Sequence, residues 1–218
     1  MRDYLAEVYR LWDLGAGADG YVNTSALADT LDVSAPAVNR MITRLKELGL
    51  LEHEPYQGIC LTPAGQREAL KELRRHRIAE AFLVNVMGFG WHEVHDEASR
   101  ISGALSETLA ARMAEMAGSP THCPHGEPIP SADGLIDPPR DFPLSEGHEG
   151  ERYSISRVLT RESDRLEYIA ALGLLPGTAL QLLHLAPFNG PLQLKVGGEY
   201  RIIGHNLAEL IKVLPLSL

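Results

Sequence analysis

The chain of 218 residues is poor in cysteine and has no long apolar run. Its two cysteines, Cys60 and Cys123, are too few for a disulfide framework, so a core must hold the fold, which a composition of 44% apolar residues allows. Nowhere do about 18 apolar residues follow one another, as a membrane span requires. These absences exclude a disulfide-stapled secreted domain and a membrane-spanning protein, and we expect the chain in the cytoplasm.

Basic residues are also scarce. Lys and Arg number 20 against 29 Asp and Glu, and a net charge of -9 argues against a protein that coats nucleic acid without specificity. The imbalance lies in the middle of the chain, where residues 78–139 contain two basic and nine acidic residues. Clustered carboxylates repel one another unless solvent or a cation separates them, so this segment invites a cation.

The first third of the chain shows short helices separated by turns. After an amphipathic first helix, two short helices follow, the first capped by Asn23 or Thr24 and the second beginning at Ser34 and ending at Gly49. The next stretch, LLEHEPYQGICLT, predicts two strands around a tight turn, and Cys60 in the second strand is expected to be buried. The pattern predicts a helix-turn-helix with a β-wing.

The second of these short helices is locally basic, with three cations and no acid between Ser34 and Lys46. A recognition helix needs such charge to meet phosphates while its first residues reach the bases, which Asn and Arg can read. The residues expected to face DNA are Ser34, Ala35, Pro36, Asn39, Arg40 and Arg44, with Tyr56 and Gln57 from the wing. The alternative is a module for protein contacts whose cations form a solvated face.

The middle and the end of the chain differ in pattern. A long helix is expected from Pro63, and a second from about Trp91 to Met116, whose apolar stripe suits packing across a two-fold axis. Residues 119–149 hold seven of the 14 prolines and predict a semi-rigid linker. From Tyr153 onward, short alternating segments with one helix predict a small β-barrel.

Coordinating side chains gather in and around the acidic middle segment. Two lie four apart on one helix and so share a face, one lies on the next helix, two lie in the proline-rich linker, and a carboxylate begins the barrel. These candidates are His76, Glu80, His95, Cys123, His125 and either Glu162 or Asp164. A thiolate, imidazoles and carboxylates together suit a divalent first-row metal. The alternative for the helical pair is a surface ion pair.

Two other function classes are open on these residues. A metalloenzyme would need an open metal position and a poised base, and no nucleophile and base motif is visible. A thiol redox regulator built on Cys123 would need an intermolecular partner. For the metal, carboxylates and imidazoles permit manganese or iron, whereas the thiolate favours iron, zinc or cobalt.

Several stretches resemble the diphtheria toxin repressor family of metal-dependent transcriptional regulators, over essentially the full length. They are VSAPAVNRMITRLKELGLL, RRHRIAEAFL, EVHDEASR, CPHGEPIP and GGEYRIIGHNLAELIKV. The resemblance implies a mainly α fold with a small β domain: a winged helix-turn-helix at 1–63, a helical dimerisation and metal-binding domain with its linker at 64–140, and an SH3-like, FeoA-type barrel at 150–218.

The same resemblance implies a function. It predicts a homodimer whose metal-loaded form binds a palindromic operator in double-stranded DNA and represses metal-uptake genes. It implies no enzymatic activity and no small ligand beyond the metal. The branch with the CPHG linker favours manganese, with ferrous iron as the alternative and zinc as a further possibility.

The resemblance also assigns ligands. His76, Glu80 and His95 match one metal position of the family, and in the CPHG branch Glu80, Cys123 and His125 match a ligand set completed by an acid near position 160. Thr160 stands there in this chain, so Glu162 is the expected substitute and Asp164 the reserve.

A second family site departs from the pattern. Asp3 matches a ligand there, but Ser99, Ser102 and Gly103 stand where the family has a thiolate, a carboxylate and an imidazole. The expectation is a site that is empty, or rebuilt from its neighbours Glu97 and Glu107.

Overall fold

A computed structural model describes residues 2–15 and 20–216. The chain forms two compact units, and the helix α4 (Pro63–Asn85) belongs to both. One unit contains the chain up to His76 with segments 101–110 and 129–136, and the other contains the remainder. The division falls inside α4, so the three domains expected from the sequence stay a prediction. Across the described residues, no helix has both the length and the apolar character of a membrane span.

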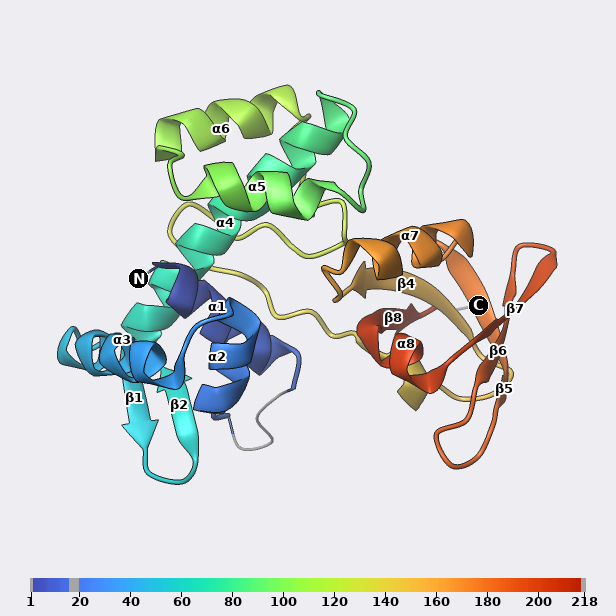
Figure 1. The fold of residues 1–218 in the computed structure, drawn as a ribbon. Coiled ribbons are helices and arrows are strands. Elements are labelled where there is room, and N and C mark those ends of the chain that lie inside the picture. The colour runs from blue at the N-terminus through green and yellow to red at the C-terminus, as the bar shows by residue number, and fades with distance from the viewer. Residues whose placement is uncertain (1, 16–19, 217–218) are drawn as a thin grey trace. The chain divides into compact units, whose positions relative to one another are not determined.

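The first unit contains the expected winged helix (Figure 1). Its elements are α1 (Arg2–Asp13), α2 (Thr24–Leu31), α3 (Ala35–Glu47), β1 (Leu51–Glu54) and β2 (Gly58–Leu61). The Asn23 side chain accepts a hydrogen bond of 2.8 Å from the Ser25 N–H, so Asn23 caps α2. Ser34 precedes α3 in an extended conformation, as a helix N-cap does, although its hydroxyl makes no capping hydrogen bond.

The wing is fixed by a close backbone approach. Val22 and Ile59 exchange backbone hydrogen bonds of 2.7 and 2.9 Å, which add a short bridge to the β1–β2 hairpin. Gly58 beside them has φ +126°, and a Cβ there would lie 2.4 Å from the Val22 carbonyl oxygen. Only glycine fits this position. Apolar residues of α1, α2, α3 and the hairpin fill the core beneath.

The single helix predicted from Trp91 to Met116 is wrong, because the chain forms two helices there. They are α5 (Val94–Ser102) and α6 (Glu107–Met116). Gly103 lies at the break, where glycine weakens a helix, and the Ser106 hydroxyl accepts a hydrogen bond of 3.2 Å from the Leu109 N–H, which caps the new helix. The apolar stripe is interrupted in consequence: Leu109 is exposed.

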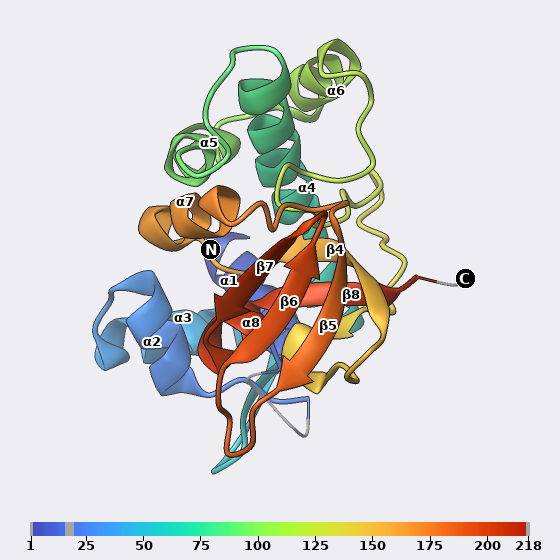
Figure 2. The ribbon, with the colours of Figure 1, turned by 90° about the vertical axis from the view of Figure 1, so that its right-hand side faces the viewer.

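The second unit ends in the expected small barrel, a six-stranded antiparallel sheet in the order β3-β8-β4-β5-β6-β7 (Figure 2). Its strands are β3 (Phe142–Pro143), β4 (Arg152–Val158), β5 (Ala179–Leu185), β6 (Leu192–Val196), β7 (Glu199–Ile203) and β8 (Ile211–Pro215). Its helices are η1 (Leu144–Glu146), α7 (Ser163–Ala171) and α8 (His205–Leu210). Alternate residues of the strands, such as Tyr153 and Ile155, face the core, as the period of two predicts.

Candidate metal centre and DNA-binding face

Coordinating side chains meet in two overlapping groups. His76, Glu80 and His95 form one group and Glu80, Cys123 and His125 the other, and within each group the donor atoms all lie within 4.8 Å of one another. Glu80 is common to both. Five of the six side chains predicted as one metal site therefore come together, arranged as two adjacent donor sets around one carboxylate.

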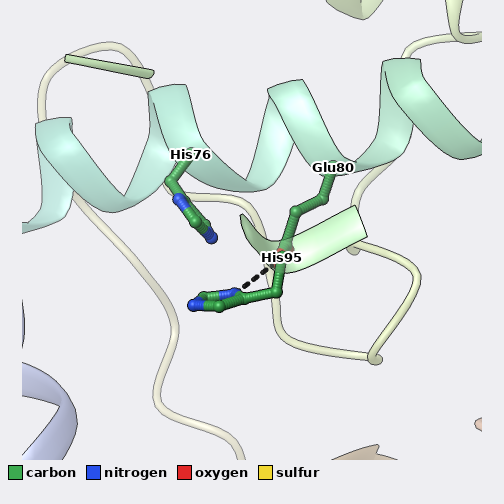
Figure 3. A group of neighbouring side chains, drawn as sticks. All are labelled: His76, Glu80 and His95. Atoms are coloured by element: carbon green, nitrogen blue, oxygen red, sulfur yellow. Dashed lines mark hydrogen bonds and ion pairs between the residues drawn. The ribbon is translucent and has the colours of Figure 1, made fainter. Parts of the chain in front are cut away.

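The first group is built by α4 and the start of α5. His76 and Glu80 are one turn apart on α4 and point to the same side, where the ring of His95 faces them (Figure 3). His95 Nδ1 lies 3.0 Å from Glu80 Oε1. His76 is 5% exposed and Glu80 only 1%, so the alternative of a solvated surface pair does not hold.

The second group depends on a tight turn in the proline-rich segment. The Gly126 N–H donates to the Cys123 carbonyl at 2.9 Å, and the Cys123 N–H donates to the Glu127 carbonyl at 2.9 Å. Gly126 has φ +84°, which glycine adopts readily. The turn places the Cys123 thiol and the His125 imidazole beside Glu80.

Arg77 attaches this turn to α4. Its guanidinium donates to the Pro128 carbonyl at 2.7 Å and to Glu127 Oε1 at 2.8 Å, and the residue is 1% exposed. Charge-assisted hydrogen bonds of this kind satisfy a buried arginine that would otherwise be costly. Because Arg77 lies three residues before Glu80, the helix that carries the shared carboxylate also holds the turn.

The orientation of His125 is set by Trp91. His125 Nε2 lies 2.8 Å from the Trp91 carbonyl oxygen, and the two rings are 5.2 Å apart. A carbonyl only accepts, so Nε2 carries the hydrogen and Nδ1 is left facing Glu80 Oε1 at 3.6 Å. Histidine ligands are oriented in this way in metal sites, through a hydrogen bond from the other ring nitrogen.

The surroundings of the second group favour the protonated forms of Cys123 and His125 when no cation is bound. Burial raises the pKa of the Cys123 thiol well above its usual value, and the charges of Glu80 and Glu127 raise it further. For His125, burial lowers the pKa, but the hydrogen bond and the charge of Glu80 outweigh it, and the net pKa is raised. A buried carboxylate with a thiol and an imidazole is thus a site where a divalent cation can replace protons.

The donors fit such a cation. Imidazole nitrogens, one thiol and a buried carboxylate are the ligands that divalent first-row metals take, and Glu80 has two oxygens with which to serve both donor sets. The residues that could hold metal are His76, Glu80 and His95 in one set and Glu80, Cys123 and His125 in the other.

The residues predicted to face DNA lie on the surface of the winged helix. All eight are exposed: Ser34 just before α3, then Ala35, Pro36, Asn39, Arg40 and Arg44 along α3, and Tyr56 and Gln57 at the tip of the hairpin. Within the described part of the chain, Arg40 and Arg44 have no acidic partner in an ion pair, so their charge is available to phosphates. Tyr56 has φ +69° at the turn of the wing.

Comparisons with known proteins cover nearly the whole chain. Three domain models match in succession: the iron dependent repressor N-terminal DNA binding domain at 1–59, the iron dependent repressor metal binding and dimerisation domain at 62–131, and the FeoA domain at 142–215. A solved manganese-dependent transcriptional repressor in complex with manganese is 33% identical, with a TM-score of 0.91 and 99% of each chain covered. The chain belongs to the diphtheria toxin repressor family.

Relatives with known roles support the same family. The diphtheria toxin repressor of Corynebacterium efficiens is 28% identical over 192 residues, which are 83% of this chain and 81% of that protein. The iron-dependent repressor IdeR of Mycobacterium tuberculosis is 35% identical over 134 residues, 62% of this chain and 55% of that protein. The resemblance and the fold inferred from the sequence are confirmed: this member of the diphtheria toxin repressor family is a metal-dependent, DNA-binding transcriptional regulator and not an enzyme.

The acid expected to complete the family's ligand set is not brought to either group. Glu162 lies on the surface at the start of α7 and forms an ion pair of 2.9 Å with Arg165, and Asp164 is exposed as well. Thr160 is buried, and its hydroxyl accepts the Glu162 N–H at 3.3 Å. The assignment of Glu162 as a ligand stays a prediction.

The second family site has few donors in this chain. Asp3, Ser99 and Gly103 are exposed and Ser102 is buried, and none of them belongs to a group of metal donors within the part of the chain that the structure describes. The two acids considered as replacements are engaged elsewhere. Glu97 forms an ion pair with Arg100, and Glu107 forms one with Arg74.

Sequence reasoning missed Arg77, Glu127 and Trp91, which hold the ligand turn. The first two carry a usable signal, since a basic residue between His76 and Glu80 must either reach solvent or find an acid, and Glu127 stands two residues after His125. The contact of Trp91 has no such signal. Cys60 was expected to be core, but it is half-buried, since its strand lies at the surface of the small wing.

Proposed function

We propose that this chain is a manganese-responsive repressor of metal-uptake genes, acting in the cytoplasm as a homodimer on a palindromic operator. Ferrous iron is the second candidate for the effector and zinc a third. The observation that carries the proposal is the buried carboxylate of Glu80, which is shared by two donor sets, in a chain whose winged helix presents unpaired cations on α3.

Manganese is compatible with the first donor set, and likeness to a solved relative supports it. Two of the three side chains in the first set are imidazoles and the third is a carboxylate, a combination that suits manganese and iron, whereas the Cys123 thiol shifts affinity toward iron and zinc. The solved relative at 33% identity is described as a manganese complex, and the curated relative at 35% as iron-dependent. Affinity order alone does not set selectivity, so both metals belong in the test.

The regulatory step follows from where the donors lie. α4 carries His76, Arg77 and Glu80 and begins in the winged-helix unit, so whatever fixes the ligand turn to α4 acts on a helix that is continuous with the DNA-binding module. A divalent ion, when bound, supplies the positive charge that lets the Glu80 carboxylate and the Cys123 thiolate lie together. Glu80, Cys123 and His125 then hold the turn on the helix in one arrangement.

In a two-fold dimer, the two recognition helices must lie about 34 Å apart to enter successive major grooves. An ordered cluster favours that spacing over others. If metal binds the competent arrangement tenfold better than the rest, the gain in DNA binding is about 1.4 kcal/mol, and each further factor of ten adds the same.

The burial of Cys123 argues against the alternative of a thiol redox regulator. Redox-sensing thiols are exposed and have a lowered pKa, whereas Cys123 is buried and its pKa is raised. Cys60 is half-buried, and burial and the charge of Glu52 raise its pKa too.

The test is operator binding by the full chain with manganese, ferrous iron under anaerobic conditions and zinc, each against a chelated sample. Tight binding with manganese at the lowest free metal concentration, lost in Glu80→Gln, is the expected result. Peroxide should have no effect on the chelated protein. The proposal fails if the chelated protein binds the operator as tightly as the metal-loaded one, or if Glu80→Gln retains the full response.

A further inference from the structure

Strand β4 carries an irregularity next to the ligand turn. Ile155 pairs with Val213 of β8, but Arg157 pairs with Lys212, so Ser156 is an extra residue in β4. Such a β-bulge bends its strand locally and aims nearby groups in a set direction.

A buried ion pair holds this bulge. Asp141 accepts hydrogen bonds from Arg157 Nε at 2.8 Å and Nη2 at 3.0 Å, and from the Ser156 hydroxyl at 2.6 Å. The side chain of Asp141 is 1% exposed and that of Arg157 is 6% exposed. One carboxylate thereby fixes two consecutive residues of β4, with the two-pronged geometry that makes arginine pairs directional.

The ligand turn rests on this bulge through backbone contacts. The Val158 N–H donates to the His125 carbonyl at 2.9 Å. A Cβ on Gly126 would lie 2.0 Å from the Ser156 carbonyl oxygen and 2.8 Å from the Arg157 Cα, so the turn meets the strand with no space between them. Trp91, whose carbonyl orients His125, packs against the core of the same barrel.

We propose that the β4 bulge, held by the Asp141–Arg157 ion pair, is the seat that positions Cys123 and His125 for metal, and that Asp141 is a positioning residue of the metal site. The inference rests on the proposed function, in which these two side chains are ligands. It adds that the barrel sets the affinity of the second donor set, because the turn takes its position from β4.

The physical reason is the cost of loosening this contact. Without the Asp141 carboxylate, the buried Arg157 guanidinium would lose two charge-assisted hydrogen bonds, and the strand would move in response. A turn seated on the bulge would move with it, and ligand sites tolerate only a few tenths of an ångström of displacement. His76 and His95 come from α4 and α5 and not from the turn that lies against the bulge, so the first donor set should be spared.

The experiment uses the full chain and Co²⁺ as the probe, because a cobalt–thiolate bond gives a charge-transfer absorption that cobalt bound by imidazole and carboxylate lacks. Asp141→Asn keeps the shape of the side chain and removes its charge. The expected result is cobalt binding at Cys123 that is about 10- to 100-fold weaker, the range found when groups behind metal ligands are removed. The affinity for cobalt at the first donor set, where binding gives no thiolate band, should stay within about threefold of the wild type.

Gly126→Ala tests the seat from the other side and should abolish the thiolate band. Its matched control is Gly173→Ala, in which the same kind of strain (φ +71°) arises with nothing within 4 Å of the new Cβ. A control for surface charge is Glu149→Gln, an exposed acid of the same barrel that pairs with His184. Both controls should keep the wild-type band.

The cobalt–thiolate band of the variants distinguishes a wrong positioning role for the bulge from a wrong ligand assignment. If Cys123→Ser keeps the band and the affinity, the ligand assignment itself is wrong. If Cys123→Ser loses the band while Asp141→Asn and Gly126→Ala bind cobalt as the wild type does, the seat is wrong and the ligands stand. Should Asp141→Asn unfold without metal, Ser156→Ala, which removes one hydrogen bond and keeps the ion pair, must still weaken the band selectively.

Discussion

Helix α3, which we expect to contact DNA, and the cluster of candidate metal donors present charge in opposite ways. On α3 the cations are exposed, follow one another along one helix and have solvent around them. In the cluster the donors are mostly buried, come from α4, α5 and the turn at 123–126, and depend on one shared carboxylate. Exposed charges are screened by salt and contribute nearly independently, whereas the contributions of buried charges in one network depend on one another.

Because of this difference, the two regions should respond differently when one of their residues is replaced. An exposed cation provides a steady attraction to phosphate that changes little when its neighbour is removed. A buried set of donors has two states, with protons or with metal, and its members lose their effect together. We therefore expect the metal-dependent switch in the cluster and the contact with DNA on α3.

The sharpest test of the cluster as a unit is Glu80→Gln. Because both donor sets contain Glu80, one substitution should weaken both by more than about 100-fold, beyond the cost of removing groups that only support ligands. Metal stoichiometry and calorimetry on the purified dimer measure it. The matched control is Glu72→Gln, another buried acid of α4, which pairs with Arg75 outside the cluster. Glu72→Gln should lower the stability of the protein and leave metal binding intact. An equal loss of metal affinity in both variants would contradict the prediction that Glu80 serves both donor sets.

On the DNA side, Arg40→Ala and Arg44→Ala should each weaken operator binding. If the arginine reaches a base edge, the loss should be about 10- to 100-fold and specific to the operator sequence; if it contacts phosphate, the loss should be the same for all DNA sequences. A phosphate contact also lowers the slope of log affinity against log salt by about one. The double variant should show the sum of the single effects, in contrast to the cluster.

The control is Arg112→Ala on α6, an exposed arginine paired with Glu115, which should bind DNA as the wild type does. Binding isotherms over a salt series give all three quantities. A double variant much worse than the sum of its parts would show that the cations of α3 act together, as the buried donors are expected to do.

The two regions also differ in how far the sequence predicts them. The expected DNA face is local: the start of α3 after Ser34, a run of cations and the turn at Gly49 specify which side chains of one helix face outward. The donors were predictable by type, but their division into two sets around Glu80 depends on contacts between segments some 40 residues apart. The break between α5 and α6 was not predicted because apolar residues recur at helical spacing across it in the sequence, whereas Gly103 and Ser106 determine where the helix ends and the next begins.

The pH dependence of metal binding sharpens the contrast further. The pKa of the Cys123 thiol is raised well above its usual value by burial, so the thiol is protonated at neutral pH and must lose a proton to bind metal. Metal affinity should therefore rise with pH, about tenfold per unit for each proton displaced, and the rise should continue up to the raised pKa. His125, whose pKa is raised as well, adds a second proton at lower pH.

Competition between metal and a pH-insensitive chelator measures this slope, and proton release into weak buffer counts the protons directly. Cys123→Ser should lose the component at higher pH, while DNA binding of the loaded protein stays nearly flat over the same range. A flat metal affinity from pH 6 to pH 9 would mean that the thiol is not a ligand.

The smallest expected effect concerns Glu162, which the family pattern suggests as a ligand and which lies at the surface beside Arg165. An exposed ion pair of this kind contributes little, and a carboxylate in solvent has no need of a cation. Glu162→Gln should therefore change metal affinity by less than about threefold, a limit set by the few tenths of a kcal/mol such pairs provide. Asp164→Asn, also exposed, is the matched control. A loss of tenfold or more in Glu162→Gln alone would show that this surface side chain moves to the metal and joins the buried donors.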